Sequence, residues 1–363
     1  MRYALIMAGG SGTRLWPMSR TALPKQLIPF INGKSLLQLA YDRLDGLVPA
    51  ENRFICAGQH HADLICRTLG LPVEQFIGEP IGRDTLNAVG LSAAVIAQRD
   101  PDAVIAVFTA DHVIQPVDQF QKIVEHGYRL VEQTPNTLVT FGITPTLAAT
   151  SYGYLQLGQA IDESAHIVKQ FREKPDSATA QEYFAAGANR YLWNSGMFVW
   201  RASTLLDCIH RYEPSNHLGL MKIGTAWSTP QRNTVLSEIF PSLKKISVDF
   251  AVMEPAGRDP QVRVAAVPMP LQWLDVGSWP MFAETCRHDA AGNALGTDRV
   301  LLLETRGSVV ASNDPKHLIT TIGCDDLIII HTPDATLVCR KDCAESIKEL
   351  HRQIGQQFGP EII

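Results

Sequence analysis

Short apolar runs rich in valine and isoleucine alternate along most of this chain with segments whose apolar residues recur at helical spacing. This alternation favours an α/β fold on a mostly parallel sheet, because parallel strands need crossover connections that helices usually supply. The predicted strands are 3–8, 53–57, 103–108 and 138–143, and the predicted helices are 85–98, 117–133 and a segment behind Ser35. Ligands of such sheets bind beyond the carboxyl ends of the strands. We therefore expect the glycine-rich loop after residue 8 and Asp111 to lie at one sheet edge.

The pattern changes after about residue 285. Short β-type runs separated by glycine, aspartate and proline follow at 300–303, 308–311, 318–321, 327–330 and 336–338, and a helical segment at 344–357 comes last. A chain of 363 residues is long enough for two domains. We predict a large α/β domain over 1–285 and a small β-rich domain with a terminal helix over 286–363.

Composition excludes several classes of protein. The net charge of −5 argues against a nucleic-acid partner, which requires a basic surface to displace counterions. No uninterrupted apolar stretch approaches the ~18 residues of a membrane span, and the N-terminal apolar run is too short for a secretory signal. The seven cysteines are odd in number and scattered, which indicates neither a disulfide framework nor a zinc site. We expect a reduced, cytoplasmic protein without a membrane partner.

The first predicted strand leads into a glycine-rich segment that carries several cations. A dinucleotide-binding loop opens directly into a helix and a P-loop ends in Gly-Lys-Ser/Thr, and neither pattern is present. Pro17 and Pro24 also prevent a straight helix here. Residues 8–26, called the strap below, are therefore predicted to be extended, with glycines that let backbone N–H groups approach phosphate oxygens. The cations of the strap are Arg14, Arg20 and Lys25. The alternative is a tight turn with solvated cations.

Seven motifs follow one another along the chain. They are AGGSGTRLWPMSRTALPKQ (8–26), GEPIGRDT (78–85), TADH (109–112), YGY (152–154), FREKP (171–175), WNSGMF (193–198) and WLDVGSW (273–279). With these motifs the chain resembles the sugar-nucleotide pyrophosphorylases, and closely the bacterial mannose-1-phosphate guanylyltransferases, from residue 1 to about 363. Three positions depart from the family pattern. The family more often has asparagine at the position of Asp84, proline at that of Asn87 and a polar residue at that of Leu274.

This resemblance implies a fold and a reaction. The fold is a Rossmann-like, mostly parallel mixed sheet of the nucleotide-diphospho-sugar transferase type, with a C-terminal domain like a left-handed β-helix that can support a homodimer. The reaction is the transfer of GMP from GTP to α-D-mannose 1-phosphate, which gives GDP-mannose and pyrophosphate and uses Mg²⁺ as cofactor. Many relatives continue into a phosphomannose isomerase domain. The chain stops before that domain, so no isomerase activity is expected.

Residues that match the family's motifs take their roles by resemblance. Those expected to bind the nucleotide are Ala8, Gly9, Gly10, Gly12, Thr13, Arg14, Lys25, Glu79, Arg83 and Thr85. Those expected to bind the sugar phosphate are Asp111, Gly153, Glu173, Lys174 and Asn194. The expected catalytic cations are Arg14, Lys25 and Lys174, and the expected metal ligands are Asp111 and Asp275. Two anions must meet in this reaction, so charge neutralisation and alignment matter more than acid–base catalysis.

The metal ligands have a structural alternative. Carboxylates suit Mg²⁺, which usually takes one or two of them together with phosphate oxygens and water. Asp111 or Asp275 alone is also typical of a turn after a strand. His112 is interpreted as packing near the site, because Mg²⁺ prefers oxygen ligands to nitrogen.

The substrate-binding residues have alternatives as well. The Glu173–Lys174 pair can equally be a solvated turn that starts a helix. A carboxylate at Glu79 can accept hydrogen bonds from guanine and Arg83 can donate to it, but the two can also form a structural ion pair.

Two other functions are alternatives to the guanylyltransferase interpretation. One is a nucleotidyltransferase for another sugar 1-phosphate or another base, because a few side chains decide such selectivity. The other is a non-catalytic regulatory subunit that binds sugar nucleotides, which would require the loss of a metal-binding or phosphate-binding residue. All of those residues are present.

Overall fold

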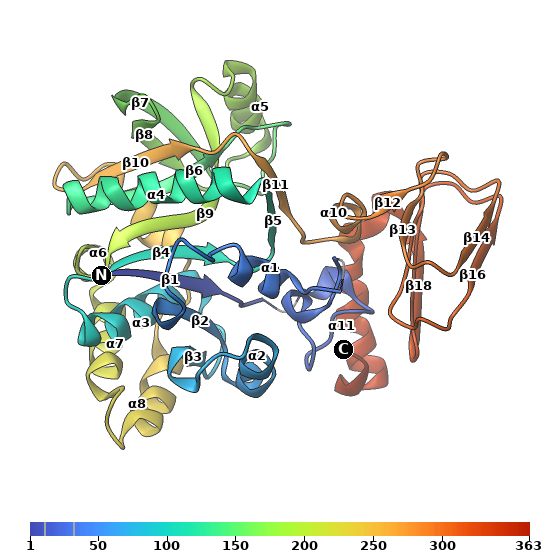
Figure 1. Ribbon diagram of the computed structural model, residues 1–363, viewed down its shortest axis with the longest axis horizontal. Coiled ribbons are helices and arrows are strands. Elements are labelled where there is room, and N and C mark those ends of the chain that lie inside the picture. The colour runs from blue at the N-terminus through green and yellow to red at the C-terminus, as the bar shows by residue number, and fades with distance from the viewer. Residues whose placement is uncertain (11, 32) are drawn as a thin grey trace. The chain divides into compact units, whose positions relative to one another are not determined.

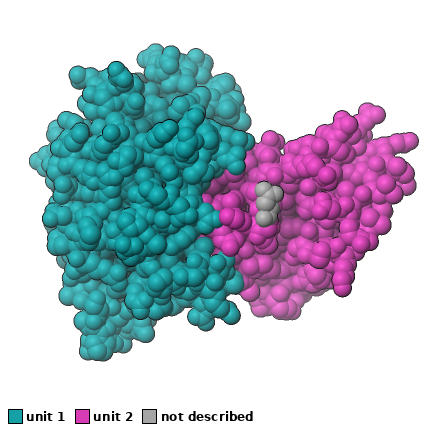
Figure 2. Space-filling view, in the orientation of Figure 1, with its two compact units in different colours: residues 1–9, 41–109, 114–273 teal, residues 10–40, 110–113, 274–363 magenta. Residues whose placement is uncertain are grey.

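The computed structural model describes residues 1–10, 12–31 and 33–363; Ser11 of the strap lies outside them. The chain forms two compact units, coloured separately in Figure 2. Unit 1 contains residues 1–9, 41–109 and 114–273, and unit 2 contains residues 10–40, 110–113 and 274–363. The units therefore interleave along the chain, and most of the strap belongs to the same unit as the C-terminal segment. The domain boundary near residue 285 stays a prediction.

Unit 1 is built on a nine-stranded mixed sheet with the order β3-β2-β1-β4-β9-β6-β10-β8-β7. Its strands are β1 (Arg2–Met7), β2 (Arg53–Gly58), β3 (Phe76–Glu79), β4 (Val104–Thr109), β6 (Thr137–Ile143), β7 (Tyr154–Asp162), β8 (Ala165–Arg172), β9 (Tyr191–Arg201) and β10 (Arg263–Pro268). Strands β1 to β4 are mutually parallel, as are β6 and β10. Strand β9 is antiparallel to both β4 and β6 and joins the two parallel groups.

Helices cover both faces of this sheet, as Figure 1 shows. Those of unit 1 are α2 (Ala62–Leu69), α3 (Asp84–Arg99), α4 (Val117–Gln133), α5 (Ser177–Ala186), α6 (Ala202–Tyr212), α7 (Pro214–Ala226), α8 (Arg232–Ile239) and α9 (Glu254–Ala256). Neighbouring residues of β4 point to opposite faces: Val107 joins the apolar core with α3, whereas the Phe108 ring lies 5.7 Å from that of Phe120 on α4. A strand buried on both faces has to be apolar throughout, which explains the continuous apolar run at 103–108.

The parallel strands end at a common edge of the sheet. In the β1–β4 ladder Met7 pairs with Thr109, and in the β1–β2 ladder it pairs with Cys56. Gly58 pairs with Glu79 at the end of β3. The glycine loop and the segment that leads to Asp111 thus follow strand ends at this edge, as expected from the sequence. Glu79, the last residue of β3, lies at the same edge.

The C-terminal part of unit 2 forms a parallel coil. Its strands are β12 (Arg287–His288), β13 (Ala294–Gly296), β14 (Val300–Leu303), β15 (Val309–Ser312), β16 (Ile319–Ile322), β17 (Leu327–Thr332) and β18 (Ala335–Arg340). β13, β15 and β17 stack in parallel in one sheet, and β14 and β16 stack in parallel in another, so the chain returns to the same sheet after each turn. This β-helix-like arrangement agrees with the predicted β-rich domain; a left-handed coil stays a prediction.

The remaining elements of unit 2 are short. They are the 3-10 turns η1 (Thr13–Leu15), η2 (Lys25–Leu27) and η9 (Pro360–Ile362), the helix α10 (Trp279–Ala283), the 3-10 segment η8 (Lys341–Ser346) and the end helix α11 (Ile347–Phe358). The predicted end helix therefore starts as a 3-10 segment. The predicted helix behind Ser35 is α1 (Leu36–Asp42), capped reciprocally by the Ser35 hydroxyl and the Gln38 amide. Within the described residues, none of the helices combines the length and apolar character needed to cross a bilayer.

Candidate active site

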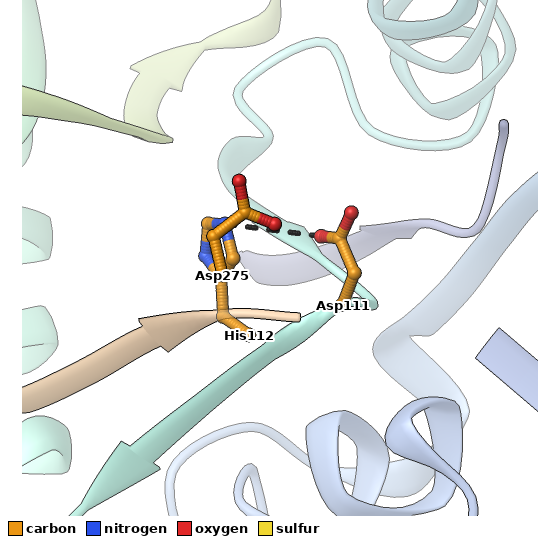
Figure 3. A group of neighbouring side chains, drawn as sticks. All are labelled: Asp111, His112 and Asp275. Carbon is orange, nitrogen blue, oxygen red and sulfur yellow. Dashed lines mark ion pairs between the residues drawn. The ribbon is translucent and has the colours of Figure 1, made fainter. Parts of the chain in front are cut away.

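The two predicted metal ligands lie together in unit 2. Asp111 directly precedes strand β5 (His112–Gln115), and Asp275 ends strand β11 (Gln272–Asp275), which pairs with β5. The Val276 N–H donates to the Asp111 carbonyl at 3.0 Å and holds the two strand ends side by side. Figure 3 shows both carboxylates turned to the same side of this ladder. Ligand atoms of Asp111, His112 and Asp275 all lie within 4.8 Å of one another.

The donor set at this position fits Mg²⁺. Two half-buried carboxylates supply the oxygen ligands that this ion prefers, and they leave room for phosphate oxygens and water. His112 is buried, and its Nε2 lies 3.8 Å from a carboxylate oxygen of Asp111. A nitrogen donor is a poor partner for Mg²⁺. The geometry therefore supports Asp111 and Asp275 as the ligands, with His112 as a neighbour of Asp111.

The strap brings a buried cation to the same cluster. Lys25 is only 8% exposed, and its ammonium lies 2.9 Å from Asp111 Oδ2 and donates to the Val276 carbonyl at 3.2 Å. Burial by itself would raise the pKa of Asp111, but Lys25 and His112 outweigh burial and hold that pKa below its usual range. Asp111 is therefore ionised at neutral pH and available to a cation.

Arg14 is the more exposed cation of the strap. Its guanidinium forms an ion pair with Glu345 of η8 at 2.9 Å, and a Cβ added at Gly277 would lie 3.4 Å from its Nη2. Gly277 follows Asp275 by two residues, so Arg14 lies near the second carboxylate. The side chain is 42% exposed and its ion pair is with a well-exposed partner, so a phosphate can take the place of Glu345 at little cost. The Arg20 side chain, by contrast, pairs with Asp334.

A second cluster of predicted residues lies within unit 1. Glu173 and Lys174 follow β8, and their charged groups lie 3.0 Å apart. A Cβ added at Gly153 would lie 2.5 Å from Glu173 Oε2, and the Asn194 N–H donates to the Gly153 carbonyl at 2.8 Å. Lys174 has a φ of 42°, an uncommon conformation for a residue other than glycine. Such strain is often found at functional sites, which suits a lysine that binds phosphate.

The predicted base-reading residues also lie in unit 1. Glu79 is buried at the end of β3, and burial together with the charge of Asp84 raises its pKa to about 7. Arg83 and Thr85 make local contacts: the Arg83 guanidinium donates to the Pro241 carbonyl, and the Thr85 hydroxyl accepts from the Val248 N–H at 2.9 Å. No Glu79–Arg83 ion pair occurs in the part of the chain that the structure describes. The role of these residues in base recognition stays a prediction.

The chain resembles known proteins over almost its whole length. Two family models match it, "Nucleotidyl transferase" over residues 3–292 and "MannoseP isomerase/GMP-like beta-helix domain" over residues 298–354. The mannose-1-phosphate guanylyltransferase of Escherichia coli (strain K12) is 36% identical, over 97% of this chain and 73% of its own length. This chain belongs to the mannose-1-phosphate guanylyltransferase family.

Further comparisons agree with this family. Xanthan biosynthesis protein XanB of Xanthomonas campestris pv. campestris is 34% identical, over 96% of this chain and 72% of its own length. A crystal structure described as mannose-1-phosphate geranyltransferase from Thermus thermophilus has a TM-score of 0.85 and 31% identity, and the match covers 97% of this chain and 99% of that one. The fold class and the enzyme class predicted from the sequence, a nucleotidyltransferase of the mannose-1-phosphate guanylyltransferase family, are confirmed.

One residue beside the cluster of Gly153, Glu173, Lys174 and Asn194 was not predicted from the sequence. Asp249 begins the π-helical segment η7 (Asp249–Met253), and its carboxylate accepts a hydrogen bond from the Asn194 amide at 2.8 Å. The two residues are separated by 55 positions. The only local signal is the pair Val248–Asp249, which places a carboxylate after an apolar residue and is too common to single out a site.

Replacing Gly12 by alanine should impair the strap. Gly12 has a φ of 63°, and an added Cβ would lie 2.7 Å from Lys25 Cβ. The left-handed conformation costs alanine about 1–2 kcal/mol, and the contact forces Lys25 to move. We expect kcat/KM for the nucleotide to fall by about 10- to 100-fold, about 1.4–2.7 kcal/mol. Steady-state kinetics measure this effect.

Gly292→Ala is the matched control for Gly12→Ala. Gly292 has a φ of 77°, and apart from its own chain neighbours no described residue has an atom within 4 Å of its added Cβ. This variant adds backbone strain without touching Lys25, so its kinetics should equal those of the wild type. Gly12→Ala kinetics no different from those of the control would contradict the role of the strap.

Proposed function

We propose that this chain transfers GMP from GTP to α-D-mannose 1-phosphate and releases GDP-mannose and pyrophosphate. The observation that carries the proposal is the pair of carboxylates, Asp111 and Asp275, beside the buried ammonium of Lys25. This arrangement suits phosphoryl chemistry, which depends on neutralising and aligning anions. The choice of GTP and mannose 1-phosphate rests on the relatives, whose names state mannose-1-phosphate guanylyltransferase activity.

In the proposed reaction an oxygen of the sugar phosphate attacks the α-phosphorus of GTP. The bond from that phosphorus to the bridging β-phosphate oxygen breaks, and its electron pair leaves with pyrophosphate. The attacking phosphate is already ionised at neutral pH, so no general base is required. Asp111 and Asp275 would hold Mg²⁺, and a bound Mg²⁺ neutralises phosphate charge.

The remaining roles fall to side chains of both clusters. In unit 2, Lys25 and Arg14 neutralise the triphosphate, and the glycines of the strap let backbone N–H groups reach its oxygens. In unit 1, Lys174 binds the sugar phosphate, while Glu173, Asn194 and the backbone at Gly153 bind sugar hydroxyls. Burial would lower the pKa of Lys174, but the Glu173 hydrogen bond and the charges of Asp249 and Asp84 raise it, so Lys174 is cationic at working pH. Glu79, Arg83 and Thr85 are proposed to recognise the nucleotide.

A substrate matrix tests this function. Pyrophosphate release is measured with GTP, ATP, UTP and dTTP against mannose, glucose and galactose 1-phosphates in the presence of Mg²⁺. We expect the highest kcat/KM with GTP and mannose 1-phosphate. Turnover of another pair instead would retain the enzyme class and refute the substrates. No release with any pair would favour the non-catalytic regulatory subunit.

Location and assembly are also proposals. All seven cysteines are free thiols, which suits the reducing cytoplasm. A homodimer is proposed from the family resemblance, and light scattering of the purified chain would test it.

A further inference from the structure

Asp249 lies beside Asn194 and Glu173 in unit 1 and has no role in the reaction as described so far. We propose that Asp249 binds a hydroxyl of the sugar beside the one bound by Glu173, and also fixes the Asn194 amide for sugar recognition. The inference rests on the proposed function and deepens it, because it adds a residue that determines sugar affinity.

The first argument is the orientation of Asn194. Its Oδ1 accepts from the Thr140 hydroxyl at 2.8 Å and from the Gly196 N–H at 3.3 Å. Its Nδ2 donates to Asp249 Oδ1 at 2.8 Å. These contacts leave one orientation for the amide, with its nitrogen on the side of Asp249. The second N–H of that nitrogen has no partner among residues 1–10, 12–31 and 33–363 and can donate to a ligand.

The second argument is that Asp249 is a costly residue for a purely structural role. Burial, and the nearby charge of Glu173, raise the pKa of Asp249 to about 7. An asparagine would accept the same hydrogen bond from Asn194 without the cost of placing two carboxyl groups together. Carboxyl groups held in an unfavourable environment occur preferentially at functional sites, where a ligand supplies the missing partners.

The third argument is that the backbone holds Asp249 firmly. The Val248 N–H donates to the Thr85 hydroxyl at 2.9 Å, and the Leu86 N–H donates to the Ile246 carbonyl at 3.2 Å. The segment before Asp249 is therefore fastened to the start of α3. A side chain on such a support keeps its position when substrate binds, as precise recognition requires.

The side chains around Asp249 have the chemistry to bind a polyol. Glu173 and Asp249 offer carboxyl oxygens as acceptors, Asn194 offers a donor, and Lys174 offers a cation next to them. A sugar 1-phosphate presents neighbouring hydroxyls, which can donate to the carboxyl oxygens and accept from the amide, and a phosphate, which suits the ammonium. An apolar ligand would leave the carboxyl groups without partners.

Two substitutions separate binding from positioning. Asp249→Ala removes both contacts, and we expect kcat/KM for the sugar 1-phosphate to fall by about 10- to 100-fold, as for one lost hydrogen bond to a charged group. Asp249→Asn keeps an acceptor for Asn194, so its loss should be smaller. The KM for the nucleotide should stay within about twofold in both variants, since only sugar binding is affected. Asp102→Ala and Asp102→Asn are the controls, because Asp102 is 87% exposed in the same unit.

The pH profile provides a readout that a structural role would not change. The charged and titratable groups around Asp249 are Glu173, Lys174 and, near Lys174, Asp84. Only ionised Asp249 is a full acceptor, so kcat/KM for the sugar should rise through about pH 7 in the wild type, relative to Asp249→Asn. The pKa of Asp249 is higher in the folded state than in the unfolded state. The free energy of unfolding therefore falls as the pH rises from the usual pKa of an aspartate to about 7. Asp249→Asn should therefore gain thermal stability over the wild type at pH 8 but not at pH 4, which also verifies its folding.

The outcomes distinguish this inference from the proposed function. Each variant is assayed with whichever sugar 1-phosphate the wild type uses, and a loss confined to that substrate supports the inference. Equal losses for both substrates, or none, overturn it. If the wild type turns over no pair, the proposed function fails, and calorimetry with mannose 1-phosphate decides about Asp249. Weaker binding by Asp249→Ala than by the wild type then supports the inference, and an unchanged Kd or no binding by the wild type overturns it.

Discussion

Replacing Asp275 by asparagine should lower turnover by about 10³-fold or more while the fold stays intact. A bound Mg²⁺ contributes several kcal/mol of charge stabilisation in the transition state, and about 4 kcal/mol corresponds to about 10³ in rate. An amide keeps the shape of Asp275 but loses the charge that attracts the ion. Asp111→Asn should have a similar effect, and it also breaks the ion pair with Lys25. Asp275→Asn is therefore the cleaner test.

The measurement is kcat as a function of Mg²⁺ concentration, with circular dichroism to verify folding. The concentration that gives half-maximal rate should rise for Asp275→Asn, and excess Mg²⁺ should restore part of the rate. Asp298→Asn is the control, because that side chain is fully exposed. An active Asp111→Asn, Asp275→Asn double variant would show that the metal site lies elsewhere.

Replacing Lys25 by methionine should lower kcat by about 10²- to 10³-fold, the range seen when one charge-stabilising donor is removed from a preorganised site. Methionine retains much of the apolar stem of lysine, which packs against Gly12, but not the ammonium 2.9 Å from Asp111. The Mg²⁺ dependence distinguishes this variant from Asp275→Asn. Lys25 is a positive charge beside a proposed metal ligand, so its removal should leave Mg²⁺ affinity unchanged or increase it.

Titrations of kcat against Mg²⁺ and against nucleotide measure both effects. Lys122→Met serves as the control, since Lys122 is 78% exposed and its ion pair with Asp118 is a surface contact. A Lys25→Met variant that needs more Mg²⁺, and that regains the full rate when Mg²⁺ is added, would show that Lys25 acts only by supporting the metal site.

Local pattern was sufficient to predict much of unit 1. The helix predicted at 117–133 is α4 with the same bounds, and the strand predicted at 103–108 differs from β4 by one residue at each end. Both predictions succeeded because burial repeats every 3.6 residues in a helix and is continuous in a strand covered on both faces. The edge position of the glycine loop followed from the rule that ligands gather beyond parallel strand ends.

Three features were decided only by the tertiary structure. β9 runs antiparallel between β4 and β6, although nothing in its own sequence records its direction. Lys25 reaches Asp111, which is 86 positions away along the sequence, and Asp249 reaches Asn194, which is 55 positions away. A contact of this range leaves no periodic trace in a single sequence, because either residue alone also suits a turn or a surface.

The sequence by itself determined the α/β class and the residues that match the family. It also showed that the strap is not a P-loop. The prolines of the strap exclude a helix by local sterics, and a continuous apolar run indicates a strand that is buried on both faces. Only the tertiary structure placed the Lys25 ammonium beside the Asp111 carboxylate and brought Asp249 to Asn194. Which charges face one another depends on how distant segments pack, and that packing sets the electrostatics on which the proposed chemistry depends.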